Sequence, residues 1–193
     1  MTTTNSDAKV SVTPEVFSFI DYDAREIAEV VKRVAERLGI SNPIRLAVDE
    51  STPLAKMSAS FVDDDGAPIT DAPSSDSIIG VHVESGALED RKRLTTFSAD
   101  SAELSLGQVL LRARDRLRPD FAEVPPDEQL SLAQNAAWDA YCAGRMERAG
   151  FAPNEQRFRY NFRNRFGFTD DVDATFDRVW RSDDLAWSDL PHP

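Results

Sequence analysis

Two near-identical interruptions near the C-terminal end of the chain constrain its fold more than any other feature. Gly150-Phe151 and Gly167-Phe168 divide the stretch from Glu128 to Arg181 into three segments, each with the length and composition of a helix. Glycine often follows the last residue of a helix, because it adopts the left-handed conformation at little steric cost. We therefore expect three consecutive helices in this part of the chain.

The middle segment interleaves arginines with aromatic residues, an alternation that by itself is typical of a strand. Two observations favour a helix instead. Pro153 suits a first helical position and Asn154-Glu155 suits a first turn, and the aromatic residues also recur on one helical face, at Phe158, Phe162 and Phe166. We predict a helix here, followed by a last helix that Thr169 caps.

The first 120 residues show strand patterns around one clear helix. Asp23 and Glu26 have capping-box spacing, apolar residues then recur at helical spacing as far as Leu38, and Gly39 ends the run. Two further helices are expected, one from Asp100 to just before Pro119 and one over about 128–149. The stretches whose composition predicts strands are 16–20, 44–48, 54–62, 79–83 and 94–97.

Strands grouped first and helices grouped after them favour an α+β fold over an alternating α/β fold. We predict a small N-terminal sheet of about four strands with a covering helix, followed by a C-terminal helical bundle. Residues 1–13 are polar and aperiodic, so they predict a disordered tail. Residues 14–120 would then form the α+β domain, and residues 121–193 a helical subdomain packed on it as one unit.

Charge and composition exclude several classes of protein. The net charge of −12 argues against nucleic-acid binding, which needs a positive surface, and no apolar run is long enough to predict a membrane span. A single cysteine, Cys142, indicates a reducing compartment, and the first residues do not resemble a secretory signal, so we expect a cytoplasmic protein. Few lysines among many arginines, with abundant Asp and Ala, are typical of a GC-rich bacterial genome.

The arginine-rich segment allows three interpretations. Its arginines pair with the Asp-rich stretch 170–189, or they bind a carboxylate or phosphate of a partner, or they contact nucleic acid in a helix-turn-helix arrangement. Trp187 allows two, because it either packs the chain end onto the bundle or anchors a partner. The candidate binding residues are Arg157, Arg159, Arg163, Arg165 and Trp187.

Three acidic residues are the candidates for catalysis. Asp49 and Glu50 follow a predicted buried strand, where carboxylates can act as acid and base or bind a metal, although a solvated turn is the simpler interpretation. Asp139 lies among small and apolar residues, so we expect it to be buried, most simply in an ion pair with an arginine of the following helix. No cysteine and histidine spacing predicts a zinc site, and no glycine-rich loop predicts a cofactor.

These observations favour a protein-binding or regulatory module. The Arg/aromatic helix would contact a protein partner or a small anionic ligand, with aromatic rings supplying buried area and arginines orienting an acidic group. A hydrolase-like or metal-assisted enzyme using Asp49 and Glu50 is the first alternative. A nucleic-acid-binding regulator is the second.

Overall fold

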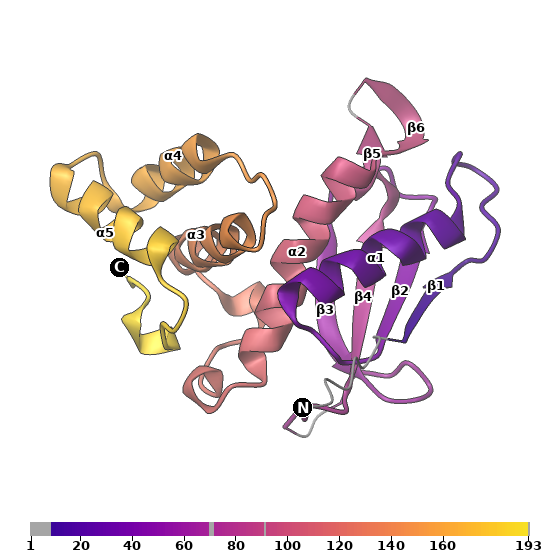
Figure 1. Cartoon of the computed structure of the whole chain (residues 1–193), viewed down its shortest axis with the longest axis horizontal. Helices are drawn as coiled ribbons and strands as arrows, with labels where there is room; N and C mark the ends of the chain where they lie inside the picture. Colours follow the sequence, from indigo (N-terminus) through magenta and orange to yellow (C-terminus); the bar gives the residue numbers. More distant parts are fainter. Residues whose placement is uncertain (1–8, 70–71, 91, 193) are drawn as a thin grey trace, which may run out of the picture. The chain divides into compact units, whose positions relative to one another are not determined.

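The fold is α+β, with a small N-terminal sheet followed by helices, as predicted (Figure 1). The computed structural model describes residues 9–69, 72–90 and 92–192. The chain divides into two compact units, Met1–Arg114 and Asp115–Pro193. Within the described residues, no helix is both long enough and apolar enough to cross a membrane.

The first unit contains a four-stranded sheet in the order β1-β2-β4-β3, in which β3 is antiparallel to β4 and the other neighbours are parallel. A separate two-stranded hairpin joins β5 to β6. The elements in chain order are β1 (Val10–Thr13), α1 (Ala24–Leu38), β2 (Ile44–Asp49), β3 (Met57–Val62), β4 (Ile78–Glu84), β5 (Glu89–Asp90), β6 (Arg93–Phe97) and α2 (Ala99–Arg116).

One face of the sheet is buried and the other is open. Ile44, Leu46 and Val48 of β2 lie in register with the apolar residues of β4, and all are buried. The helix α1 covers this face (Figure 1) and buries its own stripe of Ile and Val, while the alternate residues Ala47 and His82 are exposed. This is the pattern of a sheet with one solvated side.

The ends of α1 follow from its sequence as predicted. The Asp23 carboxylate accepts hydrogen bonds from the backbone N–H groups of Arg25 and Glu26. Gly39 has a φ of 66°, and the backbone N–H of Ile40 closes the helix onto Ala35. The next long helix, α2, lies beside α1, since the Arg33 guanidinium lies 2.8 Å from the Glu103 carboxylate.

The predicted strand at residues 16–20 is wrong, and the first strand is β1, inside the predicted disordered tail. Long-range pairing decides this: β1 lies parallel to β2, and Ile44 N donates to Lys9 O at 2.8 Å. Val16 and Phe19 are instead 80% and 73% exposed. Residues 1–8 of the predicted tail lie outside the described residues.

The second unit contains three helices, α3 (Leu132–Arg148), α4 (Glu155–Phe166) and α5 (Asp170–Arg181), and a 3₁₀ turn at Trp187–Asp189. The prediction of a helix rather than a strand at the Arg/aromatic segment is confirmed. The predicted start of α3 near 128 is wrong, because a capping box between Ser131 and Gln134 begins the helix later.

The helices α3 and α5 lie close together at Gly144. A Cβ atom built on this residue would lie 1.9 Å from the backbone oxygen of Trp180, so no larger side chain fits without moving one of the helices. Two small residues that precede it in the helix, Ala140 and Ala143, are also fully buried. Glycine is therefore required here because a Cβ atom would clash with the backbone of Trp180, and not because of its φ angle.

We predict that Gly144→Ala destabilises the second unit by about 3 kcal/mol or more, because its Cβ clashes with backbone. Helix propensity alone predicts the opposite sign, a gain of about 1 kcal/mol. Trp138, Trp180 and Trp187 all belong to this unit, so tryptophan fluorescence during urea unfolding reports on it alone. The exposed Ala174→Gly on α5 is the propensity control, with an expected loss of about 1 kcal/mol. A stabilised Gly144→Ala would contradict the close approach.

Candidate functional site

Two arginines of α4, Arg159 and Arg163, form ion pairs with acidic side chains. Arg159 Nη2 lies 2.7 Å from Glu155 Oε1 and 2.5 Å from Asp177 Oδ1, and its guanidinium covers the Phe176 ring at 4.3 Å. Arg163 Nε donates to Asp173 Oδ1 at 2.7 Å, with a second contact between the same side chains. The hydrogen bond from Arg163 holds the pKa of Asp173 below its usual value.

These pairs hold α4 against α5, since Asp173 and Asp177 are spaced one turn apart, as are Arg163 and Arg159. The aromatic face of α4 packs in the same place. The Phe162 ring lies 5.5 Å from Phe176, and the Phe158 ring lies 5.9 Å from Trp180. For Arg159 and Arg163, the arrangement is therefore the internal ion-pair face that the Asp-rich stretch made possible.

The outer face of α4 has a different composition. We use this name for Arg157, Tyr160, Asn161, Asn164 and Arg165, together with Phe168 just beyond the helix. The Tyr160 and Phe168 rings are 6.2 Å apart, edge to face, and these residues remain 62% and 63% exposed. Arg157 and Arg165 are also exposed and take part in no ion pair among the residues that the structure describes.

Helical geometry separates the two sets of arginines. At 3.6 residues per turn, positions 157, 160, 161, 164 and 165 share one side of α4. The phenylalanines and the paired arginines take the opposite side. Gly167, with a φ of 113°, then reverses the chain after α4, and Phe168 returns to the Tyr160 ring. An exposed aromatic pair and two unpaired guanidiniums thus lie on one surface.

Trp187 is not an exposed anchor. Its ring lies 5.4 Å from Trp138, edge to face, and 6.2 Å from Phe121, and the residue is half-buried. The His192 ring covers it from the other side at 5.0 Å. The structure therefore gives Trp187 the packing role that was one of the two interpretations.

Asp49 and Glu50 hold two different loops. The Asp49 carboxylate accepts hydrogen bonds from both Ser51 and Thr52, which lower the pKa of Asp49 to about 2. Glu50 Oε2 accepts from the backbone N–H groups of Ser18 and Phe19 at 2.6 and 2.7 Å. A shallow pocket of about 440 Å³ in this unit is lined by other residues, among them Lys9, Ser11 and Arg45.

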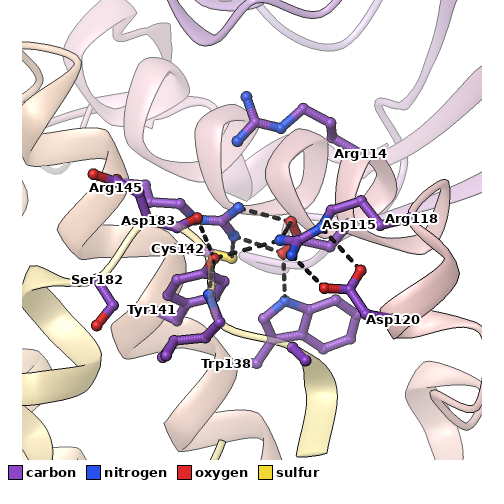
Figure 2. Close-up of polar contacts among 12 residues, drawn as sticks. Arg114, Asp115, Arg118, Asp120, Trp138, Tyr141, Cys142, Arg145, Ser182 and Asp183 are labelled. Carbon is purple, nitrogen blue, oxygen red and sulfur yellow. Dashed lines mark hydrogen bonds and ion pairs between the residues drawn. The ribbon is translucent and has the colours of Figure 1, made fainter. Parts of the chain in front are cut away.

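The fully buried carboxylate is Asp115, which the sequence analysis did not single out (Figure 2). Both of its oxygens bind Arg145, at 2.7 and 2.6 Å, and Trp138 Nε1 donates to Oδ2 at 2.8 Å. Asp139, the predicted buried carboxylate, is only half-buried. One signal could have found Asp115: it lies one helical turn after Leu111, which belongs to the apolar stripe of α2.

Tyr141 connects this ion pair to the C-terminal segment 183–185. The Arg145 guanidinium lies 3.8 Å from the centre of the Tyr141 ring, and its Nη2 lies 3.4 Å from Cys142 Sγ. Tyr141 Oη donates to Asp183 O at 2.5 Å and accepts from Leu185 N at 3.1 Å. Burial raises the pKa of Tyr141, so the hydroxyl keeps its proton and can donate.

Burial by itself lowers the pKa of Arg145, but Cys142, Asp115 and Tyr141 together raise it above its ordinary value. Arg145 therefore remains charged, and the Asp115–Arg145 pair has the features of a structural ion pair. The described residues include no group of three or more His, Cys, Asp or Glu that could hold a metal ion. Comparison with protein families, curated proteins and solved structures found no match.

We predict that Arg145→Met destabilises the second unit by about 3–5 kcal/mol, because it leaves Asp115 buried without its partner. The double variant Asp115→Asn/Arg145→Met should lose less, since it leaves no buried charge and keeps an acceptor for Trp138. Urea unfolding followed by tryptophan fluorescence measures both. An Arg145→Met loss of less than about 1 kcal/mol would contradict a structural role for the pair.

The two classes of arginine on α4 should differ in their effect on stability. Arg159→Ala removes contacts to Glu155 and Asp177, so we expect a loss of roughly 1 kcal/mol. Arg157→Ala makes the same chemical change on the same helix without breaking an ion pair, and should stay within about 0.5 kcal/mol of the wild type. Equal losses of unfolding free energy for the two variants would show that the ion pairs of Arg159 do not contribute to stability.

Proposed function

We propose that this protein is a protein-binding module whose contact surface is the outer face of α4. The observation that carries the proposal is the coexistence of an exposed aromatic pair, Tyr160 and Phe168, with exposed arginines that make no ion pair with any described residue. Aromatic residues and arginines are enriched where proteins bind one another, because they bury large area and orient acidic groups.

The chemistry of this surface suggests a partner segment that combines carboxylates with apolar or aromatic side chains. Arg157 and Arg165 offer guanidinium forks that match carboxylate geometry. The rings of Tyr160 and Phe168 offer apolar area that is now in contact with water. Asn161 and Asn164 on the same face supply amide donors and acceptors.

The other two hypotheses have less support. Asp49 and Glu50 are occupied by hydrogen bonds that shape two loops. Arg159 and Arg163 are neutralised by acidic neighbours, which leaves two of the four arginines for phosphate contacts, in a chain whose net charge is −12. The binding proposal uses only side chains that have no such internal role.

A cytoplasmic location belongs to the same proposal. Cys142 is the single cysteine of the chain, and it is buried beside Arg145. A disulfide within the chain is therefore impossible, and burial keeps the thiol from pairing with another protein. Both properties suit a reducing compartment.

The test is selection of peptides from a phage-displayed random library on the immobilised protein. We expect enriched peptides to carry Asp or Glu next to aromatic or aliphatic residues, and to shift the backbone NMR signals of residues 157–168. Arg165→Glu should weaken their binding at least about tenfold, and Phe168→Ala should weaken it without lowering the melting temperature, since its ring is already exposed.

The matched control is Arg181→Glu on α5, which makes the same charge change at a residue whose side chain is 76% exposed and whose contact with Asp177 is long, at 3.4 Å. Binding should be unchanged in this variant, apart from a uniform electrostatic effect that salt removes. Peptides that shift signals elsewhere, or that bind Arg165→Glu and Arg181→Glu equally, would overturn the proposal.

A further inference from the structure

The outer face of α4 is self-complementary when it is paired with an antiparallel copy of itself. Reversing the helix about a point between Phe162 and Arg163 exchanges the positions of Tyr160 and Arg165, and of Asn161 and Asn164. Each exchange brings chemically matched groups together, a guanidinium with an aromatic ring and an amide with an amide. A closed two-fold interface requires this property, because each residue type must suit the partner's reversed surface.

The aromatic residues follow the same symmetry. The Tyr160 and Phe168 rings form one edge-to-face pair, and position 160 lies within a turn of the centre of the helix. An antiparallel copy would therefore bring two such pairs together at the middle of the interface. Aromatic clusters of this kind favour offset and edge-to-face packing, and they remove exposed apolar area from water.

Charge complementarity sets the direction. Asp170 and Asp171 are exposed, directly after the outer face and at the C-terminal end of α4, and they take part in no ion pair among the described residues. Arg157 is exposed near the N-terminal end of the same helix. Antiparallel pairing brings each Arg157 to the partner copy's acidic end, whereas parallel pairing would place like charges together.

We propose that the protein partner of this surface is a second copy of the chain, forming a two-fold dimer through antiparallel α4 helices. This inference rests on the proposed function, since it names the partner of the same surface. The contact is small, because α4 has 12 residues, so association should be weak and concentration-dependent.

Sedimentation equilibrium from about 10 µM to about 1 mM tests the proposal. The wild type should shift from monomer to dimer across this range. Arg157→Glu alone, and Asp170→Lys/Asp171→Lys alone, should each weaken association about tenfold or more, because each puts like charges at both ends of the interface. An equimolar mixture of the two should restore it as a heterodimer, because both ends are then again oppositely charged.

Arg181→Glu is again the control, and its association should match that of the wild type. A wild type that stays monomeric, charge-reversed variants that still associate, or a mixture that fails to restore the dimer would each overturn the second-copy proposal. Peptide binding at 157–168 by a strictly monomeric protein would overturn this proposal alone. A protein that neither associates nor binds selected peptides would overturn the proposed function as well.

Discussion

The buried Asp115–Arg145 pair is the interaction on which the second unit depends. A carboxylate with no exposed surface requires partners; Arg145 donates two hydrogen bonds to it from the last turn of α3, and Trp138 donates a third. The neighbouring residue, Gly144, is where α5 crosses α3 against bare backbone. The charge pair and the helix crossing therefore constrain the same turn of α3.

The position of α5 determines which arginines of α4 form ion pairs. Asp173 and Asp177 reach only the guanidiniums on the α5 side of the helix, those of Arg163 and Arg159. The remaining guanidiniums, on Arg157 and Arg165, point to the outer face, where the described part of the chain offers no acidic partner for an ion pair. A single arginine-rich helix thus has a structural side and an unsatisfied side. This division, and not the number of arginines, supports a binding role.

Local patterns predicted most of the fold, and long-range contacts account for the errors. The helix ends at Asp23, Gly39 and Thr169 could be predicted, because a capping residue forms its hydrogen bonds within one turn of the helix. The strand at Val10–Thr13 was missed because its stability comes from pairing with β2, more than 30 residues away. For the same reason the sequence could list four candidate arginines but could not separate Arg157 and Arg165 from the paired two, since that depends on where α5 lies.

The distribution of charge explains why a contact would form at α4. The chain carries a net charge of −12, whereas the outer face of α4 carries the guanidiniums of Arg157 and Arg165, so two copies, or this chain and another acidic protein, repel each other over most orientations. At physiological salt this repulsion is screened beyond about 8 Å, and short-range contacts decide association. In the proposed contact, the outer face of α4 supplies the exposed rings and guanidiniums that make these short-range contacts. An acidic protein with one basic, aromatic face restricts its partners by repulsion elsewhere as much as by attraction there.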